Sequence, residues 1–208
     1  LATLLAGTHA LVVMPTGSGK SLCFQIPALV QDGLTVVVSP LVALMEDQVA
    51  ALKLAGVAAD TINSSRPYDV NARTWRQAAN GEMRLLYLSP ERLMTERMLD
   101  ALARLPVTLI AIDEAHCISR WGPSFRPEYE ALVRLGTVFP EVPIAALTAT
   151  ADAATRNDIA DKLFDGEGRT FVTGFDRPNI RLAVEVRRDA KRQLLDFVGA
   201  RPGQCGIV

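Results

Sequence analysis

Short runs of apolar residues alternate with longer stretches of mixed apolar and polar residues over most of this chain. The short runs are continuous rather than alternating, and continuous apolar runs are typical of strands in a sheet that is covered on both faces. This pattern predicts strands at Ala10–Val13, Thr35–Ser39, Ala59–Ile62, Arg84–Ser89, Thr108–Asp113 and Pro143–Thr148.

The longer stretches between these runs predict helices. They lie at about Lys20–Val30, Leu41–Leu54, Tyr68–Asn80, Pro90–Leu105, Arg126–Leu135 and Asp152–Phe164. Strict alternation of strand and helix predicts an α/β fold, a doubly wound, mainly parallel sheet flanked by helices. Ligands on such sheets bind at the carboxyl ends of the strands, so the residues that follow each strand are the candidates for chemistry.

The last part of the chain departs from this alternation. Peripheral strands are predicted at Phe171–Asp176 and Ile180–Val186, and Arg187–Ala200 has the pattern of a charged helix or a linker. The stretch Arg201-Pro202-Gly203 then indicates a domain boundary. We therefore expect one domain over residues 1–200, and over residues 201–208 a linker with the start of a second domain.

Composition narrows the class of protein. With 49% hydrophobic and 22% charged residues among 208, the chain is globular, and it contains no apolar run near the ~20 residues that cross a bilayer. A net charge of −1 argues against a nucleic-acid binder that relies on positive charge alone. Scattered cysteines predict no zinc site and suit a reducing cytosol; they are Cys23, Cys117 and Cys205.

A glycine-rich turn follows the first predicted strand. Gly17 and Gly19 let the backbone curl so that its N–H groups face a phosphate, and the next helix adds the partial positive charge of its N-terminus. Lys20 can reach the β- and γ-phosphates, and the Ser21 hydroxyl can ligate Mg²⁺. The candidate ATP-phosphate residues are Thr16, Gly17, Ser18, Gly19, Lys20 and Ser21.

Met14 stands where the usual phosphate-loop pattern has its first glycine, so the turn alone leaves a nucleotide-free alternative open. The second half of a nucleotide site comes from Asp113 and Glu114, which end an apolar strand. Asp113 can hold Mg²⁺ together with Ser21, and Glu114 can orient the attacking water or accept its proton. An isolated pair would more simply cap a helix, but the two halves together predict an ATPase.

The Asp-Glu-Ala-His stretch at 113–116 is also where a family resemblance begins. The chain resembles the RecQ family of superfamily-2 DNA helicases over nearly its full length, and a methionine at position 14 is usual for that family. The resemblance is carried in the same order by Met14–Gln25, Val38–Val49, Tyr87–Leu93, Asp113–Ser119 with Trp121-Gly122, Ala146–Ala151 and Phe175–Asn179.

The resemblance implies the first RecA-like domain of a P-loop NTPase motor. It implies ATP hydrolysis that drives 3′-to-5′ translocation on single-stranded DNA and duplex unwinding, in DNA repair and recombination. By the same resemblance His116, Thr148 and Thr150 couple the nucleotide state to domain closure, while Lys20, Asp113 and Glu114 keep the roles given above. The simpler alternative for the two threonines is hydroxyl capping at a strand-to-helix turn.

Four residues at strand ends and a later loop are the candidates for contact with DNA. Hydroxyl and guanidinium groups at strand ends would contact phosphates, although both Ser-Pro pairs could equally cap helices. The segment 121–129 corresponds to the aromatic-rich loop of RecQ enzymes, and its three aromatic residues suit stacking on unpaired bases, or else packing of the loop on the sheet. The candidates are Ser39, Pro40, Ser89, Arg92, Trp121, Phe125 and Arg126, with Tyr129 as the third aromatic residue.

Pro123-Ser124 stands where the family commonly has His-Asp, a departure in the loop that is expected to sense DNA. The chain begins without methionine and stops in an apolar segment, so we expect a piece of a longer protein. An adenine-reading glutamine segment is expected before Leu1, and a second RecA-like domain with an arginine finger after Val208. The isolated 208-residue chain would then bind ATP weakly and hydrolyse almost no ATP.

The expected partners are single-stranded and duplex DNA and the second RecA-like domain of the same chain, with no membrane. The expected location is cytoplasmic, at the nucleoid of a bacterium, because an excess of Arg over Lys with many alanines suits a GC-rich bacterial source. Two alternatives stay open: another superfamily-2 motor, such as an RNA helicase or duplex translocase, and a catalytically idle nucleic-acid-binding module of the same fold.

Overall fold

The computed structural model describes residues 1–119, 124–174, 180–181 and 183–207. The chain divides into two compact units, Leu1–Phe175 and Asp176–Val208. The boundary expected near residue 200 from the sequence stays a prediction. In the described residues no helix is both long and apolar enough to cross a membrane.

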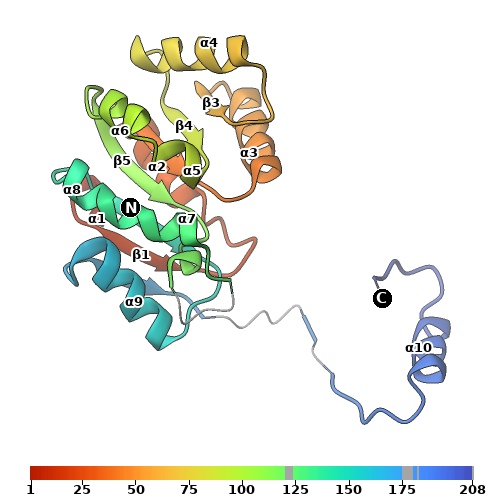
Figure 1. Ribbon diagram of the computed structural model, residues 1–208. Helices are drawn as coiled ribbons and strands as arrows, with labels where there is room; N and C mark the ends of the chain where they lie inside the picture. The colour runs from red at the N-terminus through yellow and green to blue at the C-terminus, as the bar shows by residue number, and fades with distance from the viewer. Residues whose placement is uncertain (120–123, 175–179, 182, 208) are drawn as a thin grey trace. The chain divides into compact units, whose positions relative to one another are not determined.

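The first unit is built on a seven-stranded sheet in which every pair of neighbouring strands is parallel (Figure 1). The strand order is β3-β4-β2-β5-β6-β1-β7, so the α/β fold predicted from the sequence is confirmed. The six strands predicted within residues 10–148 all form, each ending within one residue of its predicted bounds. The strands are β1 Ala10–Val13, β2 Leu34–Val38, β3 Ala59–Ile62, β4 Leu85–Leu88, β5 Val107–Ile112, β6 Ile144–Thr148 and β7 Arg169–Val172.

Helices cover both faces of this sheet (Figure 1). In unit 1 they are α1 Ala2–Leu5, α2 Leu22–Val30, α3 Val42–Leu54, α4 Tyr68–Ala79, α5 Pro90–Leu93, α6 Glu96–Leu102, α7 Pro127–Glu130, α8 Leu135–Val138 and α9 Ala153–Phe164, with 3₁₀ turns η1 Ala115–Ile118 and η2 Ala131–Arg134. Helix α10, Ala190–Gly199, lies in unit 2, where a charged helix or linker was predicted.

Two predicted helices are broken in the structure. The one predicted over Pro90–Leu105 is α5 followed by α6, because the Thr95 hydroxyl accepts a hydrogen bond from the Met98 amide at 3.3 Å and starts a new helix. The one predicted over Arg126–Leu135 is α7, η2 and α8 in succession. The strand predicted at Ile180–Val186 is wrong for residues 180–181 and 183–186, which form no strand.

Successive residues of one strand point to opposite faces and so enter two separate cores. In β2, Val36 and Val38 belong to the core that also holds Leu99 of α6 and Ile159 of α9. Val37, between them, belongs to the core that holds Phe24 of α2. Both faces of the strand are therefore buried, which is the physical reason that its sequence is a continuous apolar run.

The strand order brings the chemistry-bearing turns together. The Met14 amide donates to the Thr148 carbonyl at 3.0 Å, which ties the turn after β1 to the end of β6. The Asp113 amide donates to the Val38 carbonyl at 2.8 Å, which ties the end of β5 to the end of β2. The ends of β1, β6, β5 and β2 thus lie next to one another along a single edge of the sheet.

Candidate nucleotide-binding site and strand-end residues

The turn between β1 and α2 has the geometry of an anion cradle. Gly17 and Gly19 both have φ of +80°, a region that side chains rarely enter. Ser18 closes the turn on itself, because its amide and its hydroxyl both donate to the Pro15 carbonyl, at 3.3 and 2.6 Å.

Five amides of this turn are left without an acceptor among the described residues. They precede the nine-residue helix α2, whose N-terminus adds partial positive charge. An array of free N–H groups of this kind fits the phosphates of a nucleotide. The five amides are those of Thr16, Gly17, Gly19, Lys20 and Ser21.

Asp113 provides a buried carboxylate at the adjoining strand end, with 8% of the residue exposed. Burial raises the pKa of this carboxyl, and the neighbouring Glu114 charge raises it further. Its contact with the Glu114 amide and the nearby Lys20 charge oppose that rise. A carboxylate that burial destabilises gains most from a bound cation, so the donor set of Asp113 and Ser21 fits Mg²⁺.

Glu114 is held in a backbone conformation unusual for its residue type. Its φ and ψ are +51° and +41°, in the left-handed region, and its amide donates to the Asp113 Oδ1 at 3.0 Å. Its carboxylate lies 3.2 Å from the His116 Nδ1. That hydrogen bond is the main reason that the pKa of Glu114 lies below its usual value, so the group is ionised at neutral pH and able to accept a proton.

His116 links this carboxylate to the end of β6. Its Nδ1 lies 2.9 Å from the Thr148 Oγ1. The Cys117 sulfur and the Glu114 carboxylate raise the pKa of His116 to about 9, so the ring is an imidazolium at neutral pH. Thr148 in turn accepts from the Thr150 amide at 3.2 Å and donates to the Thr150 carbonyl at 3.1 Å.

The Thr148 hydroxyl therefore does cap a backbone amide in the turn after β6, as the simpler alternative expects. The same hydroxyl also contacts His116. Helix α9 is capped instead by Asp152, whose carboxylate accepts from the Thr155 amide at 2.8 Å. The Thr150 side chain is exposed.

Tyr129 is a site residue whose role sequence reasoning missed. It is fully buried, and its hydroxyl donates to the main-chain carbonyl of Asp113 at 2.9 Å. The interpretation of Tyr129 as an aromatic residue for base stacking is therefore wrong. Leu132 and Leu135, three and six residues later, are equally buried, and this apolar spacing could have identified Tyr129 as a core residue.

The Ser-Pro pairs at the ends of β2 and β4 behave differently from each other. Ser89 caps α5, because its hydroxyl accepts from the Arg92 amide at 3.3 Å, so the capping alternative is confirmed there. Ser39 does not cap α3, whose first residue follows Leu41 without a side-chain cap. The Ser39 hydroxyl is buried and has no hydrogen-bond partner among the described residues, and Pro40 beside it is half-buried.

Three further candidates for DNA contact differ in exposure. Arg92 and Arg126 are exposed, and the Arg126 amide donates to the Cys117 carbonyl at 2.9 Å, which brings the start of α7 against η1. Phe125 is half-buried. Trp121 and Pro123 lie outside the described residues, as does the Phe175–Asn179 segment. Contact of these residues with DNA stays a prediction.

The chain is similar to known helicases. A family model described as DEAD/DEAH box helicase matches residues 1–159. Over 204 residues the chain is 49% identical to the ATP-dependent DNA helicase RecQ of Haemophilus influenzae and 47% identical to that of Pasteurella multocida. Each match covers 98% of this chain but only 33% and 32% of the relative, so the chain spans about a third of their length.

Solved helicase structures share the fold. The DUF1998 helicase MrfA bound to DNA and AMPPNP superposes with a TM-score of 0.70 at 17% identity, covering 96% of this chain and 30% of that one. The Pyrococcus furiosus Hef helicase domain gives a TM-score of 0.61 at 17% identity, covering 84% of this chain and 37% of that one. Because the sequence identity is so low, these similarities support only the fold, which is that of a RecA-like helicase domain.

Proposed function

We propose that this chain, which belongs to the DEAD/DEAH box helicase family, is the ATP-binding motor domain of a RecQ-type DNA helicase. The observation that carries the proposal is the convergence of two turns on one sheet edge. The turn after β1 offers free amides and Lys20, and the turn after β5 offers Asp113 and Glu114. Similarity to RecQ enzymes over 98% of the chain supports the choice of subfamily.

Each group at this edge has a role in ATP hydrolysis. The loop amides and Lys20 bind the phosphates, and Ser21 and Asp113 hold Mg²⁺, which when bound neutralises charge on the phosphates. Glu114 orients the attacking water and accepts its proton, because its carboxyl group is ionised. Its backbone is held in place by the hydrogen bond that its amide donates to the Asp113 carboxylate.

His116, Thr148 and Thr150 transmit the state of this site across the sheet edge. The contacts from the Glu114 carboxylate to His116 and on to Thr148 form an unbroken path from β5 to β6. A change in the charge or position of Glu114 during hydrolysis alters this path directly. We infer that the path couples hydrolysis to movement of the DNA strand along Ser39, Ser89 and Arg92.

The whole protein would use this cycle for 3′-to-5′ translocation on single-stranded DNA and for duplex unwinding, in the cytoplasm of a bacterium. The RecQ identity of the bacterial relatives supports this proposal. A second RecA-like domain would supply the arginine finger, which in other phosphoryl-transfer systems raises the rate by roughly 10³–10⁵.

The proposal is tested by ATPase assays on the full-length protein with and without single-stranded DNA. Glu114→Gln removes the proton acceptor and is expected to lower kcat by about 10²–10⁴-fold while ATP binding is retained. Lys20→Ala is expected to weaken ATP binding itself, because the phosphate charge loses its partner. The matched control is Glu141→Gln, which changes an exposed carboxylate away from these turns and is expected to leave kcat unchanged.

Two results would contradict the proposal. A wild-type protein without DNA-stimulated ATPase, in which Lys20→Ala causes no further loss, would indicate an idle nucleic-acid-binding module. Unwinding of RNA duplexes in preference to DNA duplexes would indicate a different superfamily-2 motor.

A further inference from the structure

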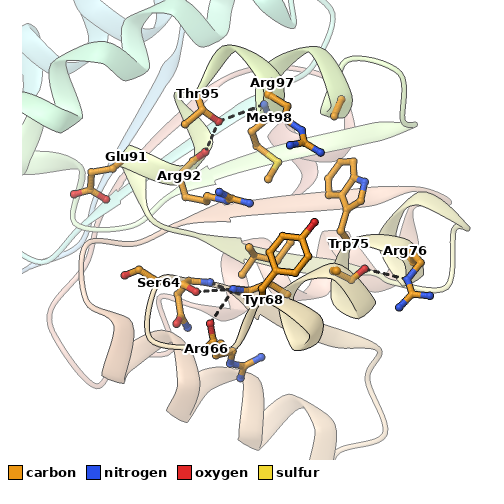
Figure 2. Close-up of a pocket in the computed structure, with 15 residues that line it drawn as sticks. Ser64, Arg66, Tyr68, Trp75, Arg76, Glu91, Arg92, Thr95, Arg97 and Met98 are labelled. Atoms are coloured by element: carbon orange, nitrogen blue, oxygen red, sulfur yellow. Dashed lines mark hydrogen bonds between the residues drawn. The ribbon is translucent and has the colours of Figure 1, made fainter.

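A pocket opens between helix α4 and the helices α5 and α6, at the end of the sheet that is formed by β3 and β4. Helix α4 forms one wall, α5 and α6 form the other, and the end of β3 contributes Ile62 and Asn63 (Figure 2). Its volume is about 760 Å³, within the range of roughly 300–1,000 Å³ that is usual for small-ligand sites. β3 and β4 lie far from β1 in the strand order, so this pocket is separate from the turns after β1 and β5, although it shares Arg92 with the candidate DNA contacts.

The pocket presents two aromatic side chains. Tyr68, the first residue of α4, is 84% exposed, and its ring extends into the pocket toward α6 (Figure 2). Trp75, two turns further along the same helix, is half-buried and packs its other side on the core. Both rings line the same pocket, and an exposed aromatic ring offers a planar partner a stacking surface.

Most of the charged residues that line the pocket are positive. Four arginines and one glutamate, Glu91, are among the residues that line it. Arg66 is already paired, since its guanidinium contacts Asp60 at 2.6 Å and Glu46 at 3.5 Å. Arg92 and Arg97 form no ion pair through their side chains within the described parts of the chain, so both are available to an anion.

Arg92 also connects this pocket to the predicted path of DNA. Its amide donates to the Ser89 hydroxyl at the end of β4, and its side chain lines the pocket. A ligand held by Arg92 can therefore continue along the strand ends toward Ser39, next to β4 on β2. A polymer that carries a planar ring next to each anionic group matches this arrangement.

We propose that this pocket binds one unstacked base of the DNA strand against Tyr68 and Trp75, while Arg92 and Arg97 bind the neighbouring phosphates. The inference rests on the proposed function, since it extends the path of the same strand. Stacking on an aromatic ring tolerates every base, so the pocket holds the strand without reading its sequence.

The test is the affinity of the full-length protein for a fluorescein-labelled dT20 strand, measured by anisotropy. Tyr68→Ala removes an exposed ring with little risk to folding and is expected to weaken binding about 5- to 100-fold. Arg97→Gln is expected to weaken binding and to reduce the slope of log K against log salt by about 0.7. Arg73→Gln is the matched control, because Arg73 is exposed on α4 but does not line the pocket.

A second strand of the same length without bases separates the two contacts. Tyr68→Ala is expected to bind this abasic strand as the wild type does, whereas Arg97→Gln weakens binding to both strands. ATPase activity without DNA is expected to be unchanged in both variants, which shows that each is folded.

The outcomes distinguish this inference from the proposed function. Wild-type protein that binds no dT20 overturns both. Wild-type binding that Tyr68→Ala and Arg97→Gln leave unchanged overturns the pocket alone. A labelled peptide of alternating glutamate and phenylalanine is titrated in parallel. If Tyr68→Ala abolishes its binding but not that of dT20, the ligand is an acidic protein segment and the proposal is wrong.

Discussion

At the scale of single residues, the proposed catalytic turn after β5 depends on the backbone of Glu114. A left-handed conformation costs a residue with a side chain about 1–3 kcal/mol, so other contacts must hold it. The Asp113 carboxylate accepts the Glu114 amide, and the buried Tyr129 hydroxyl fixes the Asp113 carbonyl. These contacts hold Glu114 in the left-handed conformation, in which its carboxylate lies 3.2 Å from the His116 Nδ1.

His116 offers a direct readout of this arrangement, because the chain has only two histidines. By NMR titration of the 208-residue chain we expect a pKa of about 9 for His116. We expect a pKa below 6.5 for His9, whose ring is desolvated against Phe164. Glu114→Gln should lower the pKa of His116 and leave that of His9 unchanged.

The same shift predicts a pH dependence of stability. The folded state holds the His116 proton more tightly than the unfolded chain does, so this contribution is complete below about pH 6.5. It is lost as the pH rises through about 9. An unperturbed pKa for His116 would contradict the contact between Glu114 and His116.

At the scale of elements, the pairing of β2 with β5 depends on a glycine. Gly33 has φ of +153°, and a Cβ there would lie 2.4 Å from the Pro106 carbonyl oxygen and 2.5 Å from the Thr108 Cγ2. The next amide, of Leu34, donates to that same carbonyl at 2.9 Å. The backbone of Gly33 therefore lies so close to Pro106, where the pairing of β2 with β5 begins, that there is no room for a side chain at position 33.

We predict that Gly33→Ala lowers the free energy of unfolding by about 2 kcal/mol, because either the backbone or the β5 contact must shift. Urea denaturation of the chain measures this change. The matched control is Gly136→Ala in α8, where no atom lies within 4 Å of the added Cβ. The control should be neutral or stabilise the chain by up to about 1 kcal/mol. Equal effects of the two variants would show that the β2–β5 approach tolerates a side chain.

At the scale of the whole molecule, we propose that the chain provides one side of a nucleotide site. Lys20, in the turn between β1 and α2, lowers the pKa of both Asp113 and Glu114 through its charge. The curated relatives extend over about three times the length of this chain, with room for the second domain that we propose as the source of an arginine finger.

We therefore predict that the isolated 208-residue chain binds ATP weakly and hydrolyses it at least about 10³-fold more slowly than the full-length protein does with DNA. Calorimetric titration with ATP and a phosphate-release assay measure the two quantities. Strong DNA-stimulated turnover by the isolated chain would show that the site is complete without a second domain.

The sequence by itself determined the order of the elements and the residue types in the two turns that we propose bind ATP. Continuous apolar runs mark strands that are buried on both faces, and the Gly17–Ser21 and Asp113-Glu114 patterns are local in the chain. Only the tertiary structure decided which distant groups meet. The Tyr129 hydroxyl reaches the Asp113 carbonyl, and His116 reaches Thr148, 32 residues away in the sequence. Those contacts follow from strand order and side-chain packing, which no local pattern encodes.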